Sequence, residues 1–173
     1  KTYQWNRIFV FLHNNLAPTR VSYNINQAKI AIGSGGFLGK GIGNATQSAL
    51  GFLPEAPTDF IFCAVAEQLG FVGSLLLFVL YGSLFYNAFK VARMSEDPFG
   101  KLIVAGICGM WIFQILENVG MDCGLMPITG IPLPFMSYGS SSMMTNFMVV
   151  GLLLSVWARR GQSRKDAGID SHR

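Results

Sequence analysis

The chain has 173 residues, of which 51% are hydrophobic and only 13% are charged. This composition is typical of a membrane protein. The 13 Lys and Arg residues against 9 Asp and Glu give a formal net charge of +4. The basic residues lie in loops and near the carboxyl end, not on one polar face, which argues against a nucleic-acid-binding protein.

Residues 1–58 are polar and rich in glycine, and we expect a long external loop. Its most distinctive stretch is AIGSGGFLGKGIG. A Walker loop would need glycine where Ser34 stands and Ser or Thr where Gly41 stands, and G-x-G-x-x-G fails as well. Two interpretations stay open. We favour a plain surface loop; the alternative is a flexible loop whose backbone N–H groups and Lys40 approach a pyrophosphate.

Three apolar segments follow, each long enough to cross a membrane. Residues 68–89 carry no charge, and as a helix they would span roughly 33 Å against a hydrocarbon core of about 30 Å. We expect one membrane domain over 59–158 and a disordered basic tail over 159–173. Its three helices are predicted at about 59–92, 101–121 and 139–158.

The distribution of Lys and Arg predicts the orientation of these helices. Lys90, Arg93 and Lys101 flank the first connection, and the tail is also basic, whereas residues 123–138 contain neither Lys nor Arg. Basic residues favour the cytoplasmic side of a membrane. We therefore expect the first connection and the tail inside the cell, and residues 1–58 and 123–138 outside.

The segment between the second and third helices is apolar but contains three prolines. Pro127, Pro132 and Pro134 exclude a regular helix over 123–138. Such backbone is tolerated at membrane depth only where it packs on protein or lines a cavity, so we expect a re-entrant or capping loop over a site. The polar run SYGSSSMMTNF comes next, and its hydroxyls either cap the third helix or line that cavity.

Several acidic side chains lie in or beside the apolar segments. Glu67 follows Asp59 by eight residues, on roughly the same helix face. Because a charge in lipid is costly, we expect Glu67 and Glu117 to face a bundle interior or water. Asp122 is expected to be solvated at the interface. The three cysteines match no metal-site spacing, and we expect buried free thiols.

Five motifs resemble those of one known family in order and spacing. They are AIGSGGFLGKGIG, LPEAPTDFIF, AEQLGFVG, NVGM and MPITGIPLPFMSYGSSS, and the resemblance covers about 23–158. They are similar to the RodA/FtsW/SpoVE family, the SEDS proteins of bacterial cell-wall synthesis, and GIPLPF is most like the RodA branch. The resemblance implies an all-α integral membrane protein of the bacterial plasma membrane. This chain would be the C-terminal part of a bundle of roughly ten helices.

The resemblance also implies a function and residues that carry it. The complete protein would be a peptidoglycan glycosyltransferase that polymerises lipid II during elongation or division, in partnership with a class B penicillin-binding protein. Asp59 would be the catalytic base, Lys40 would face the pyrophosphate, and Glu55 would orient substrate. The cofactor stays unidentified, with a divalent cation beside Glu55 as one alternative. We expect this chain alone to be inactive. The hydroxyls implied to line the substrate cavity are those of Ser137, Ser140, Ser141 and Ser142.

Two other functions stay open, and the chain departs from the family pattern in places. A lipid II flippase would use Glu67, Glu117 and the serine cluster along a path, and a scaffold for a transpeptidase would use no catalytic residue. Pro57, Gln68 and Ser140 stand where relatives usually have His, Glu and Gly. These departures keep the motif acid Asp59 but change the surroundings of the substrate.

Overall fold

The structure is a computed structural model that describes residues 20–43 and 58–159. Within these ranges it is all-helical, without a strand. Three helices are long and apolar enough to cross a membrane, which confirms the predicted all-α membrane fold. Glu55 and Pro57 lie outside the described residues. The helices are α2 (Arg20–Gly35), α4 (Ile61–Met94), α5 (Pro98–Asp122) and α6 (Ser140–Arg159).

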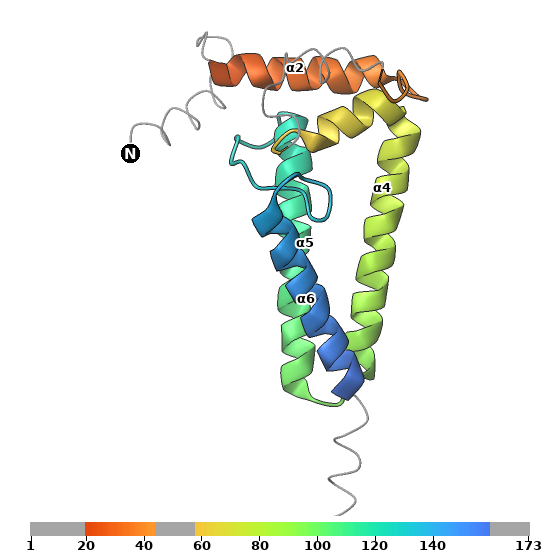
Figure 1. The fold of residues 1–173 in the computed structure, drawn as a ribbon, viewed down its shortest axis with the longest axis vertical. Coiled ribbons are helices and arrows are strands. Elements are labelled where there is room, and N and C mark those ends of the chain that lie inside the picture. Colours follow the sequence, from red (N-terminus) through yellow and green to blue (C-terminus); the bar gives the residue numbers. More distant parts are fainter. Residues whose placement is uncertain (1–19, 44–57, 160–173) are drawn as a thin grey trace, which may run out of the picture.

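The three long helices run side by side, and α2 lies across one end of them (Figure 1). We call this end the α2 end. Helix α5 finishes there and α6 starts there, whereas the connection between α4 and α5 lies at the opposite end. The α2 end therefore consists of α2, the start of α4, the last turn of α5 and the loop between α5 and α6.

Helix α4, which covers most of the helix predicted at about 59–92, is bent. Gly70 has φ 65° and ψ −158°, and it divides α4 into a short segment under α2 and a long segment along α5 (Figure 1). A straight helix of 34 residues would measure about 51 Å, well beyond the hydrocarbon core of about 30 Å. Glycine permits the break because it has no Cβ to clash at positive φ.

The glycine-rich stretch is not the flexible loop that its composition predicted. Helix α2 continues as far as Gly35, and a Cβ there would overlap the carbonyl oxygen of Ala66 on α4. The following turn folds back onto α4 through backbone hydrogen bonds. The N–H of Lys40 donates to the carbonyl of Glu67 at 3.0 Å, and the N–H of Phe71 donates to that of Gly36 at 3.0 Å. The glycines thus allow the two backbones to pack closely. Composition alone does not distinguish glycines with this role from glycines in a flexible loop.

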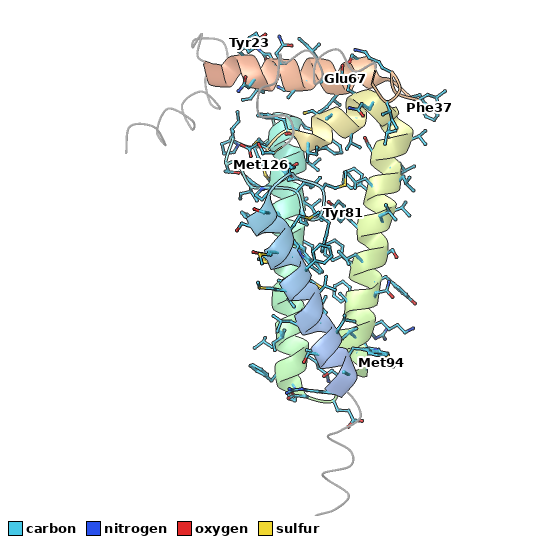
Figure 2. The ribbon with its side chains drawn as sticks, viewed as in Figure 1. Tyr23, Phe37, Glu67, Tyr81, Met94 and Met126 are labelled. Atoms are coloured by element: carbon cyan, nitrogen blue, oxygen red, sulfur yellow. The ribbon has the colours of Figure 1, made fainter. Side chains whose placement is uncertain are left out.

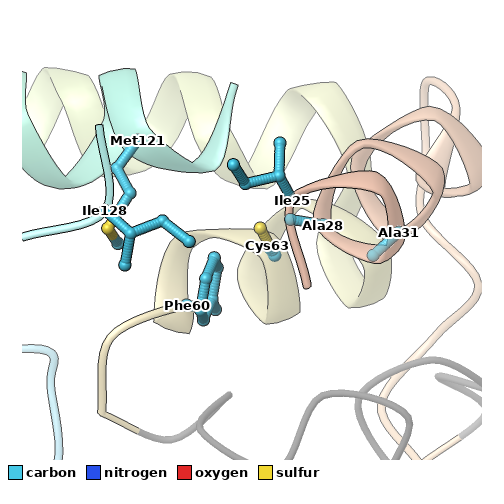
Figure 3. Packing of buried hydrophobic residues seen from close by; sticks show 7 residues of the cluster. All are labelled: Ile25, Ala28, Ala31, Phe60, Cys63, Met121 and Ile128. Carbon is cyan, nitrogen blue, oxygen red and sulfur yellow. The ribbon is translucent and has the colours of Figure 1, made fainter. Parts of the chain in front are cut away.

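Apolar side chains from four segments form a core at the α2 end (Figure 3). They come from α2, the start of α4, the end of α5 and the α5–α6 loop. Their burial joins these segments into one unit, which fixes the backbone around the start of α4. The cluster consists of Ile25, Ala28, Ala31, Phe60, Cys63, Met121 and Ile128.

The loop between α5 and α6 has no regular helix, as its prolines predicted. It is nevertheless tied to the bundle. The Tyr81 hydroxyl, on the inner side of α4 (Figure 2), donates to the carbonyl of Pro134 at 2.7 Å. The neighbouring Leu133 is fully buried. Whether this loop enters the membrane stays a prediction, but it packs on protein as such backbone must.

Candidate functional site

The candidate base Asp59 lies just before α4, at the α2 end. Its side chain is half-buried and packs against the α5–α6 loop. A Cβ placed on Gly130 would lie 3.2 Å from Oδ2 of Asp59, so the carboxylate would have to shift by a few tenths of an ångström. Gly130 also has φ 75°, in the left-handed region that favours glycine. The structure thus brings together the motif acid and the loop that was expected to cap a site.

Asn118 links the same two segments from inside α5. Its side chain is fully buried. The Nδ2 amide donates to the carbonyl oxygen of Asp59 at 2.8 Å and to that of Ile131 at 2.9 Å. Sequence reasoning did not single out this residue, although an amide inside an apolar helix is itself a signal, because it needs a buried partner.

Asp122 is also buried, which corrects the prediction that it is solvated at the interface. Its Oδ2 accepts the backbone N–H of Cys63, in the first turn of α4, at 3.1 Å. The residue preceding α4, Phe60, makes no side-chain cap, so Asp122 supplies one from another helix. The prediction was wrong because α2 and the start of α4 cover this end of α5.

The serine cluster divides into buried and exposed members. Ser137 and Ser140 line a cavity of about 440 Å³ together with Ile61, two residues after Asp59. Ser137 is buried, and its Oγ accepts the N–H of Leu133 at 2.7 Å. Ser141 is exposed and Ser142 is half-buried in the first turn of α6, and neither is among the residues that line this cavity.

Lys40 forms an ion pair with Glu67, with 3.2 Å between Nζ and Oε1. The Glu67 side chain is fully buried, whereas that of Lys40 is 30% exposed. Glu67 lies beneath α2 (Figure 2), three residues before the bend of α4 at Gly70. The expectation that Glu67 faces the interior is confirmed. The expected pyrophosphate ligand, Lys40, is directed toward this buried acid.

The remaining predicted groups have mixed outcomes. Glu117 is 8% exposed, which confirms that it faces the interior. Cys63 and Cys108 are buried and Cys123 is half-buried; all three are free thiols, as expected. The described ranges contain no group of three or more His, Cys, Asp or Glu side chains arranged to hold a metal ion. Glu55, the residue considered for a cation, lies outside those ranges.

Comparisons with known proteins identify the family of this chain. The FtsW/RodA/SpoVE family model, described as cell cycle protein, matches residues 1–162. Peptidoglycan glycosyltransferase RodA of Treponema pallidum is 44% identical over 160 residues, which cover 92% of this chain and 37% of the relative. Peptidoglycan glycosyltransferase MrdB of Escherichia coli is 40% identical over 91% of this chain and 43% of the relative. Stage V sporulation protein E of Bacillus subtilis is 39% identical over 89% of this chain and 42% of the relative.

A solved structure has a similar fold. It describes the structural coordination of polymerization and crosslinking by a peptidoglycan synthase complex. One of its chains matches with a TM-score of 0.74 and 32% identity, over 94% of this chain and 44% of that one. This chain therefore spans less than half the length of these relatives. By its matched residues and by its fold, the chain belongs to the FtsW/RodA/SpoVE family.

Proposed function

We propose that the protein containing this chain is a peptidoglycan glycosyltransferase that polymerises lipid II, with Asp59 as its catalytic base. One observation carries this proposal: the Asp59 carboxylate lies beside Gly130 of the capping loop, at one end of three apolar helices. The names of the RodA and MrdB relatives support the reaction class.

In this mechanism an acceptor sugar hydroxyl attacks the anomeric carbon of the donor glycan. A carbon–oxygen bond forms to the acceptor, and the bond to the undecaprenyl pyrophosphate breaks. Asp59 takes the proton of the attacking hydroxyl. A general base must lie within hydrogen-bonding distance of the proton that it removes. The pyrophosphate leaves with the bonding electron pair, so the atoms and charges balance without a redox partner.

The position of the site suits a substrate that has a polar part and an apolar part. The sugars of lipid II require water and its isoprenoid tail requires the bilayer, so a site at the end of apolar helices serves both. The distribution of basic residues supports an α2 end that faces outward. Lys90, Arg93, Lys101 and Arg159 all lie toward the opposite end of the bundle, the end that the positive-inside rule assigns to the cytoplasm.

Other residues would bind the substrate around this base. Ser137 and Ser140 would present hydroxyls or backbone to the cavity beside Ile61, and Ser141 and Ser142 would extend this polar rim. The ammonium of Lys40 has three donors and is partly exposed, so it would face a pyrophosphate while it holds Glu67. Glu55 keeps its proposed role in orienting substrate. A class B penicillin-binding protein is the proposed partner, as the match to a synthase complex supports.

The test compares Asp59→Asn with a matched control at the other end of the bundle. Purified complete protein, with its transpeptidase partner, is supplied with lipid II, and glycan strands are separated on gels. Asp59→Asn keeps the size of the side chain but removes the base, so we expect a loss of roughly 10²–10⁴-fold in rate. Asp97→Asn should keep full activity, because Asp97 caps α5 and Asn caps helices equally well.

The outcomes separate the competing functions. Polymer at near the wild-type rate from Asp59→Asn would refute the assignment of the base. If the unmodified protein instead moves lipid II across vesicle membranes without forming glycan, its function is that of a flippase. If it does neither but still binds its transpeptidase, its function is that of a scaffold.

A further inference from the structure

Two side chains of α5 satisfy backbone groups on either side of the start of α4. Cys63 is the third residue of α4, so its N–H has no carbonyl within the helix to which it can donate. It donates to Oδ2 of Asp122 at 3.1 Å. The carbonyl of Asp59, just before the helix, accepts from the amide of Asn118 at 2.8 Å.

These two hydrogen bonds hold the start of α4 against the end of α5. Asn118 and Asp122 lie one helical turn apart at the end of α5, so they present their side chains to the same neighbour. Helix α4 starts at Ile61 and leaves Asp59 outside it. The Asp59 carboxylate lies beside Gly130 of the loop.

The same amide also fixes the other side of the site. The second donor of Asn118 holds the carbonyl of Ile131 at 2.9 Å, and Ile131 directly follows Gly130, which lies beside the Asp59 carboxylate. One buried group therefore sets the separation between the backbone of Asp59 and the loop that covers its carboxylate. An amide is suited to this task because its NH₂ carries two donors in one plane.

We propose that Asn118 is a positioning residue for Asp59, and that Asp122 assists it by capping the start of α4 at the N–H of Cys63. This inference rests on the proposed function of Asp59. Asn118 acts through the backbone of Asp59 and of the loop, and it takes no proton itself. Its loss should therefore lower the rate of the bound complex more than it lowers the affinity for lipid II.

The first test removes the buried amide at two places in the complete protein. Asn118→Leu deletes both donors at similar size. Asn146→Leu is the matched control, because Asn146 is also buried and bridges α5 to α6, but at Trp111. With lipid II as substrate, we expect kcat of Asn118→Leu to fall roughly 10²-fold and KM to change less than about threefold. Asn146→Leu should lower the melting temperature and keep kcat per folded molecule.

A second pair of variants keeps the proposal testable if Asn118→Leu does not fold. Asp122→Leu removes the acceptor, so the N–H of Cys63 loses its partner and the start of α4 loses this attachment to α5. We expect kcat to fall, and Asp122→Asn to recover most of it, since its amide oxygen still accepts that N–H. A general loss of stability would not explain why kcat is low in Asp122→Leu and recovers in Asp122→Asn.

The results distinguish this inference from the function on which it rests. If Asp59→Asn is inactive while folded Asn118→Leu or Asp122→Leu retains kcat within threefold of wild type, the positioning role is refuted and the base stands. If Asp59→Asn is active, the proposed base is refuted, whatever Asn118 does. A parallel loss in Asn118→Leu and Asn146→Leu would also overturn the proposal, because it would show a structural role shared by both amides.

Discussion

Gly130→Ala tests how closely the capping loop controls Asp59. The added Cβ would lie 3.2 Å from Oδ2 and 3.7 Å from Cγ of Asp59, so the carboxylate must shift by a few tenths of an ångström. A misplacement of about 1 Å costs about 10²-fold in rate, so a shift of this size should cost roughly fourfold to tenfold. The left-handed φ of 75° should in addition destabilise the fold by about 1 kcal/mol.

The matched control for this variant is Gly36→Ala. Gly36 also has a left-handed φ, 57°, but an added Cβ there would meet no atom within 4 Å. Both variants should therefore lose about 1 kcal/mol of stability, which thermal unfolding in detergent measures. Only Gly130→Ala should lose polymerase activity per folded molecule. An equal rate for the two variants would refute the reasoning, because the contact with Asp59 would then be without effect on the reaction.

Two further changes probe interactions away from the base. Lys40→Met removes the ion pair to the fully buried Glu67 and should destabilise the protein by about 3 kcal/mol in chemical unfolding; adding Glu67→Gln should restore most of the loss, and no recovery would count against the pair. Trp111→Phe removes the indole N–H that donates to Asn146 at 2.9 Å, and should cost about 0.6–1.7 kcal/mol with unchanged activity per folded molecule; an unchanged melting temperature would contradict this.

Sequence alone determined the features that depend on short stretches of chain. Apolar length predicted the three membrane helices, and the prolines predicted a non-helical loop between the last two. The cost of a charge in lipid predicted that Glu67 and Glu117 face inward. Each of these follows from local physical chemistry, since a helix satisfies its own backbone and a proline disrupts it wherever it stands.

Only the tertiary structure decided the features that depend on distant partners. The glycine-rich stretch has the composition of a loop, yet its glycines serve close packing of α2 on α4 and the bend at Gly70. Asn118 and Asp122 each bond to a partner 59 positions away, and no periodic pattern in the sequence encodes such a pairing. The sequence motif identified Asp59, but its fixed position just before α4 depends on α5, whose Asn118 and Asp122 satisfy backbone groups that the end of a helix leaves without a partner.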